Sequence, residues 1–170
     1  MLRPPAIEGA PPPGAVDVAR IVWWSQRGYR HGARRGRGAG RLFSAFLALA
    51  WWPALPLLLP VQAALIARPN ARYYMSPQRD AVLAVVATTK GWHVEDHAAA
   101  HPGTGAGRAL RALVLPQLGQ AADAAQVPIY TTAATAALSA GYTAEHPELV
   151  DVGRGYPRGR QMRRAPRGRQ

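Results

Sequence analysis

Three glycines at alternate positions are the first feature of this 170-residue chain that could support chemistry. Gly103, Gly105 and Gly107 lie in the stretch HPGTGAG, directly before residues whose apolar positions repeat at helical spacing. A glycine loop at the start of a helix leaves backbone amides free to bind phosphate oxygens, and the helix dipole favours negative charge there. We therefore expect a phosphate-bearing ligand at residues 103–108.

Two common phosphate-binding loops fit this stretch poorly. A Walker loop needs lysine after its last glycine, whereas Arg108 follows Gly107. A dinucleotide-binding loop has the spacing G-x-G-x-x-G, and the spacing here is G-x-G-x-G. Its ribose-binding acid would be Asp123, which precedes the next expected strand instead of ending it. Neither loop therefore identifies the ligand.

Ionisable side chains gather just before the glycines. On an extended strand alternate residues share a face, so we expect His93, Glu95 and His97 to point the same way. Glu95 is the candidate general base and His93 the second candidate, although half-exposed strands also carry such residues without a catalytic role. His93, His97 and His101 would be spread over about 26 Å of strand, so we predict no metal site.

The elements that must position these residues have the pattern of an α/β domain. Residues 80–88 and 92–99 are apolar or alternating runs joined by a turn, which predicts a β-hairpin. The glycine loop and a helix over 108–125 follow. The β-branched run 127–133, the Ala-rich stretch 135–146 and residues 149–153 then predict a strand, a helix and a last short strand.

Several of these segments together resemble the GNAT acyltransferases. PGTGAGRAL, residues 102–110, is similar to the R/Q-x-x-G-x-G/A motif of that family, with Pro102 in place of the first Arg or Gln. VPIYTTAATAALSAGY, residues 127–142, resembles the strand and the tyrosine-ending helix that follow. His146 and Pro147 replace the usual Gly and Phe, and QMRRAP resembles a last strand. The resemblance covers about residues 81–166, because the N-terminal strand and helices are not recognisable.

The resemblance implies a partial mixed sheet of GNAT type with flanking helices, and an N-acetyltransferase that uses acetyl-CoA and an amine acceptor without a metal. Tyr142 would protonate the departing thiolate, and Glu95 would serve as the base. The residues implied in cofactor binding are Ala98 and Ala100 beside the pantetheine, Gly103, Thr104, Gly105, Ala106, Gly107 and Arg108 around the pyrophosphate, and Thr135 at a frequent Asn position.

The charge of the chain is concentrated in its flanks. The net charge is +12, yet residues 80–151 hold three basic and seven acidic residues. Residues 1–41 are rich in Pro, Gly and Arg, so we expect a disordered arm, and residues 167–170 end a basic tail. The arm could bind nucleic acid or anionic lipid, or act as a solvated linker. The chain has no cysteine, which excludes disulfides and thiolate sites.

Residues 42–67 carry no charge and are long enough to cross a membrane as a helix. Pro53, Pro56 and Pro60 make a straight span improbable, and both flanks are basic. We therefore expect a hairpin or interfacial dip bent at these prolines, with the folded domain on the cytoplasmic face. A buried helix pair is the soluble alternative.

Two other functions stay open at this point. One is a non-enzymatic, membrane-associated protein whose basic arms bind nucleic acid or anionic lipid. The other is a degenerate acyltransferase that binds CoA or nothing.

Overall fold

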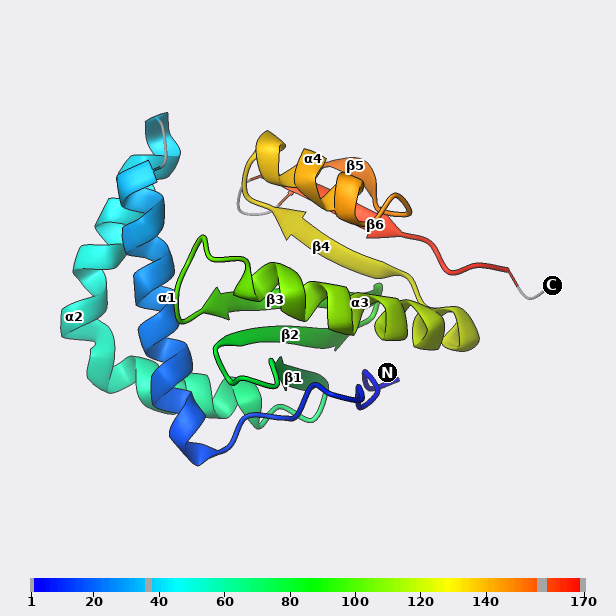
Figure 1. Cartoon of the computed structure of the whole chain (residues 1–170), viewed down its shortest axis with the longest axis horizontal. Helices are drawn as coiled ribbons and strands as arrows, with labels where there is room; N and C mark the ends of the chain where they lie inside the picture. Colours follow the sequence, from blue (N-terminus) through cyan, green and yellow to red (C-terminus); the bar gives the residue numbers. More distant parts are fainter. Residues whose placement is uncertain (1, 36–37, 156–158, 169–170) are drawn as a thin grey trace.

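The computed structural model describes residues 2–35, 38–155 and 159–168. Within them the chain forms one six-stranded sheet in the order β1-β2-β3-β4-β6-β5, flanked by helices (Figure 1). The strands are β1 (Ala71–Met75), β2 (Ala81–Thr88), β3 (Gly91–Ala99), β4 (Ile129–Ala133), β5 (Val150–Arg154) and β6 (Arg160–Arg164). The helices are α1 (Ala15–Arg35), α2 (Gly38–Ile66), α3 (Ala106–Ala125) and α4 (Ala136–Glu145).

Every strand and helix expected after residue 80 is present close to its predicted bounds. The β2–β3 hairpin is antiparallel, and the segment resembling a last strand forms β6 between β4 and β5. β2 is buried along almost its whole length because helices cover both faces of this part of the sheet. This explains why its sequence is a continuous apolar run instead of an alternating one.

Two hydrophobic clusters hold the helices to opposite faces of the sheet. On one face Leu110, Val114 and Leu118 of α3, at intervals of one helical turn, pack with Leu83 and Trp92. The second cluster, on the other face, is built from α1 and the strands; its members include Ile21, Trp24, Tyr73, Met75 and Val82. α3 and α1 therefore pack on opposite faces of the part of the sheet formed by β1, β2 and β3.

The parallel strands β3 and β4 pair over a short distance only. Their register joins Trp92 to Ile129, His93 to Tyr130 and Val94 to Thr131. No pairing continues beyond Val94 in the described part of the chain, and the strands separate there. This divergence leaves one edge of β3 open beside the glycine loop.

The predicted disorder of residues 1–41 is wrong for most of that segment. Residues 15–35 form α1, whose Ile21 and Trp24 enter the core. Residues 2–13 run extended against the sheet, where the Met75 N–H donates to the Pro11 carbonyl at 2.8 Å. The proline-rich segment before α1 gave no signal because extended backbone needs no apolar period. Residues 36–37 of the expected arm and 169–170 of the expected basic tail lie outside the described residues.

Residues 42–67 do not form the expected membrane hairpin, whereas the alternative, an interfacial dip bent at the prolines, stays a prediction. This segment belongs to the single helix α2, which runs beside α1 and then bends toward β1 (Figure 1). Pro53, Pro56 and Pro60 lie inside it, and each removes a backbone hydrogen bond, so a bend there is expected. By length and composition, Gly40–Ile66 is the one stretch of the described residues able to cross a membrane, and 6% of its apolar window is buried.

Candidate functional site

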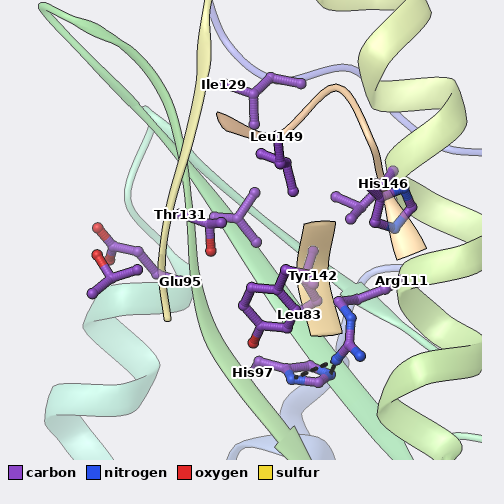
Figure 2. A pocket seen from close by; sticks show the side chains of 12 residues that line it. Leu83, Glu95, His97, Arg111, Ile129, Thr131, Tyr142, His146 and Leu149 are labelled. Atoms are coloured by element: carbon purple, nitrogen blue, oxygen red, sulfur yellow. Dashed lines mark hydrogen bonds between the residues drawn. The ribbon is translucent and has the colours of Figure 1, made fainter. Parts of the chain in front are cut away.

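Two neighbouring hollows surround the diverging ends of β3 and β4. A cleft of about 840 Å³ separates the α1–α2 pair from the glycine loop. A smaller cavity of about 130 Å³ lies between the sheet, α3 and α4 (Figure 2). His97 and Arg111 line both hollows. The cleft could therefore hold a large ligand that reaches the smaller cavity.

The glycine loop presents backbone amides to the cleft. Gly105 caps α3 with φ +93°, a conformation that side chains rarely adopt, and no side chain caps the helix. The first backbone bond into the helix runs from the Ala109 N–H to the Gly105 carbonyl. Within the described ranges, the amides of Ala106, Gly107 and Arg108 have no hydrogen-bond acceptor. These residues fit the predicted phosphate site, since an anion would satisfy the free amides.

Other loop residues are held by contacts within the protein. The Thr104 hydroxyl donates to the His101 carbonyl at 2.8 Å. A Cβ at position 107 would lie 2.4 Å from Nε2 of His97. A side chain at position 107 would thus have to displace the His97 ring, whereas a Cβ at Gly105 would meet nothing within 4 Å. Of these two glycines, Gly105 alone leaves room in front of the loop.

The expectation that His93, Glu95 and His97 share one face is wrong for His97. The β2–β3 register shifts between Val82 and Ala84, so β3 bulges opposite this point and side chains beyond it change faces. His97 then points toward Gly107 of α3, where its Nε2 lies 3.1 Å from the carbonyl oxygen. In the described ranges no group of three His, Asp or Glu gathers that could hold a metal.

His97 is held in its neutral form. Nδ1 lies 3.3 Å from Nη1 of Arg111, and the ring packs against the first turn of α3 at the wall of the cleft, where part of the side chain stays exposed. Desolvation and then the nearby Arg111 charge lower the pKa of His97 to about 4. The Gly107 carbonyl can only accept, so its contact with Nε2 favours the tautomer with the proton on Nε2, while Nη1 of Arg111 lies 3.3 Å from Nδ1 and 3.4 Å from Nε2. His97 therefore ties β3 to the start of α3.

Tyr142 of α4 lies against a charged network that joins α4 to α3. Cζ of Arg111 is 5.0 Å from the centre of the Tyr142 ring. Arg111 also grips Glu145 with two nitrogens, Nη2 at 2.9 Å and Nε at 3.1 Å from Oε2. Nε of Arg108 lies 3.2 Å from the same carboxylate. Burial raises the pKa of Tyr142. The Arg111 charge lowers this pKa and the Glu145 charge raises it, and the net increase keeps the phenol protonated at neutral pH.

Glu95 lies on the other face of the sheet from Tyr142. Its Oε1 is 3.2 Å from Nδ1 of His93, as expected for alternate residues on one strand face, and its side chain is 44% exposed. Figure 2 shows Glu95 across the β4 ribbon from Tyr142, His97 and Arg111. Glu95 and Tyr142 nevertheless both line the smaller cavity, because β3 and β4 pair no further than Val94. The opening between β3 and β4 is the route by which one substrate could meet both.

The remaining predicted site residues have structural contacts of their own. Ala98 and Ala100 pack toward the α1 cluster. Thr135 caps α4, where its Oγ1 accepts from the Leu138 N–H at 3.2 Å. Ala98 and Thr135 also line the large cleft, beside Arg108.

Sequence reasoning missed Arg111 and Glu145 as parts of the site. They lie 34 residues apart, and no motif or spacing in the sequence links them. His146, at the same end of α4, also lines the smaller cavity, and desolvation lowers its pKa. Only the packing of α4 against α3 brings these side chains together, so no local signal could have identified them.

No family model matches the sequence, and no curated protein sequence matches it. Solved structures do resemble the fold. An acetyltransferase from Thermus thermophilus has a TM-score of 0.57 and 15% identity over 96% of this chain and 99% of its own. The PaiA N-acetyltransferase from Thermoplasma acidophilum, solved with coenzyme A, has a TM-score of 0.55 and 7% identity over 95% and 99%.

A third similar structure is AAC(6')-Ib in complex with ribostamycin and coenzyme A. Its TM-score is 0.57 with 17% identity over 92% of each chain. At such identities the likeness is one of fold, and it shows that this chain has the fold of the GNAT acetyltransferases. It extends over almost the whole chain, so the expected limit to the C-terminal half is wrong. α1, α2 and β1 belong to the fold although their sequences gave no sign of it.

Proposed function

Because the chain has the GNAT fold, we propose that it is an N-acetyltransferase that moves the acetyl group of acetyl-CoA to an amine. One observation carries this proposal. The free amides at the start of α3 lie beside the point where β3 and β4 diverge, so one elongated ligand could bind its phosphates at the first and extend into the second. In the similar structures from Thermoplasma and of AAC(6')-Ib the bound ligand is coenzyme A.

The residues around the cleft suit the parts of such a ligand. The pyrophosphate would accept hydrogen bonds from the amides of Ala106, Gly107 and Arg108, with Gly103 and Gly105 allowing close approach of the backbone. The pantetheine amides would pair with the open edge of β3 near Ala98. Arg108 is 72% exposed, so it can add charge at the cleft rim while it stays near Glu145.

Transfer requires a proton acceptor for the amine and a proton donor for the thiolate. The neutral amine nitrogen attacks the thioester carbonyl, and the C–S bond breaks as the amide forms. Glu95, with His93 beside it, would take the proton that the amine loses. Tyr142 would give its proton to the sulfur. The positive charge of Arg111 over the ring then stabilises the tyrosinate that is left.

Binding is tested by calorimetric titration and thermal unfolding of the full chain with acetyl-CoA. Acetyl-CoA at 100 times its Kd should raise the free energy of unfolding by about 2.7 kcal/mol. Gly105→Val should lower the affinity for acetyl-CoA at least about tenfold, because a side chain would enter the cleft and strain the loop. Gly153→Val is the matched control, since Gly153 also has positive φ and open space around it but lies on β5.

Chemistry is tested separately by CoA release with a panel of primary amines. Release of CoA that depends on the amine supports the transferase. Binding of acetyl-CoA without transfer to any amine in the panel would leave a CoA-binding protein and contradict the catalytic part. Equal affinity of Gly105→Val and the unchanged chain would refute the loop as the phosphate site.

A further inference from the structure

An exposed apolar ridge runs along the first half of α2. Leu42, Phe46 and Leu49 recur at helical intervals and are 72%, 65% and 75% exposed, and Trp52 continues them at 48%. Trp23 of α1 stands beside the ridge, with its ring centre 5.8 Å from that of Trp52. We call these five residues the apolar ridge. Such a contiguous apolar surface marks an interaction site more often than scattered exposed residues do.

Unpaired arginines border the apolar ridge. Arg30 lies over Trp52, at 5.5 Å from the ring centre. Arg30, Arg34, Arg35 and Arg41 are exposed, and none of them forms an ion pair with a carboxylate in the described part of the chain. Residues 18–79 contain no Asp or Glu at all. The charged side chains of α2, and of α1 beyond the buried Asp17, are therefore all basic.

Side-chain contacts near the start and at the end of α2 attach this helix to the rest of the protein. Near its start, Ser44 packs so closely on Gly32 of α1 that a Cβ there would lie 2.9 Å from the hydroxyl. Trp51 lies 5.3 Å from the ring of Tyr29, and Leu65 and Ile66 pack against the sheet cluster. These contacts hold α2 against the surface of the fold and leave the apolar ridge exposed.

We propose that the apolar ridge and its arginines dock the protein onto an anionic lipid bilayer. Apolar side chains would enter the acyl boundary, the tryptophans would lie at headgroup depth, and the arginines would contact the lipid phosphates. Charge decides between the possible occupants. A second copy placed on the apolar ridge would bring two sets of unpaired arginines together, whereas an anionic membrane neutralises them.

The test is flotation of the full chain with vesicles of phosphatidylcholine alone or mixed with phosphatidylglycerol. We expect binding to the mixed vesicles that weakens as salt increases. Phe46→Gln/Leu49→Gln should reduce binding at least about tenfold, since two side chains lose their burial in lipid. Val150→Gln/Val152→Gln is the matched control, because these two residues are exposed apolar side chains on β5.

Further measurements separate the alternatives. Unchanged far-ultraviolet circular dichroism shows that the ridge variant still folds. Arg34→Gln/Arg41→Gln should weaken binding to the mixed vesicles several-fold.

A chain that floats with neither kind of vesicle overturns the proposal. A dimer in solution that Phe46→Gln/Leu49→Gln splits into monomers overturns it as well. Binding of single-stranded RNA without binding of vesicles would assign the arginines to nucleic acid and overturn it as well. None of these readouts depends on acetyl transfer.

Discussion

Tyr142 and Arg111 form the part of the candidate site where charge would change during transfer. Burial favours the neutral phenol of Tyr142, which must hold a proton to give one away. Arg111 favours the opposite state, because its guanidinium lies 5.0 Å from the ring centre and stabilises a tyrosinate. Glu145 fixes Arg111 in that position through two hydrogen bonds to one oxygen. Tyr142, the proposed proton donor, and Arg111, which would stabilise its anion, are therefore held together by Glu145.

The role of Tyr142 as proton donor is tested by Tyr142→Phe. We expect kcat to fall by about 10² or more, while acetyl-CoA affinity stays near that of the unchanged chain. The loss should be in kcat because the phenol acts in the transition state and not in binding. Single-turnover acetyl transfer at saturating acetyl-CoA measures it. Turnover equal to that of the unchanged chain would return Tyr142 to a packing role between α4 and α3.

At the scale of elements, the bulge in β3 decides which side chains enter the site. Without it His97 would share the face of Glu95; with it His97 meets Gly107 at the start of α3. One extra residue in a strand thus links the sheet to the glycine loop. Because the His97 ring fills the space in which a Cβ at 107 would lie, strand and helix constrain each other's sequence.

This link predicts a dependence of stability on pH. The pKa of His97 is about 4 in the folded protein and near 6.5 when unfolded, so the unfolded state binds the proton first as pH falls. The free energy of unfolding should therefore decrease between about pH 6.5 and 4. His97→Gln, which keeps a donor toward Gly107, should remove this part of the decrease.

The matched control for His97 is His101→Gln, at an exposed position in the glycine-containing loop. Urea unfolding at several pH values measures the difference between each variant and the unchanged chain. A pH dependence that His97→Gln leaves intact would contradict the assignment, as would the same change in both variants.

Sequence patterns predicted the elements after residue 80 well because each carries a local signal. β-branched runs such as residues 81–88 favour strands, and the glycine loop precedes a helical period. The bulge gave no such signal, since nothing in the residues around Asp96 differs from a regular strand. Arg111 and Glu145 escaped notice for another reason: their pairing depends on how α4 packs against α3.

For the whole molecule, the segment before α1 closes one side of the fold. Tyr74 donates its hydroxyl to the Pro5 carbonyl at 2.7 Å, and Nε1 of Trp92 donates to the Leu2 carbonyl at 2.8 Å. Ile7 is buried in the cluster that also holds α3. The polyproline composition that suggested disorder suits this role, because extended backbone offers its carbonyls to neighbouring donors.

Removal of residues 1–13 should therefore destabilise the chain by about 2–5 kcal/mol, since hydrogen bonds and the burial of Ile7 are lost together. Tyr74→Phe in the full chain should cost about 1–2 kcal/mol, because the Pro5 carbonyl loses its donor. In the shortened chain the same substitution should cost little, as its partner is already absent. Urea unfolding of the four proteins forms a double-mutant cycle with an expected coupling of about 1 kcal/mol. The segment does not stabilise the fold if Tyr74→Phe lowers the free energy of unfolding equally in the full and the shortened chain. An unchanged urea midpoint after removal of residues 1–13 would show the same.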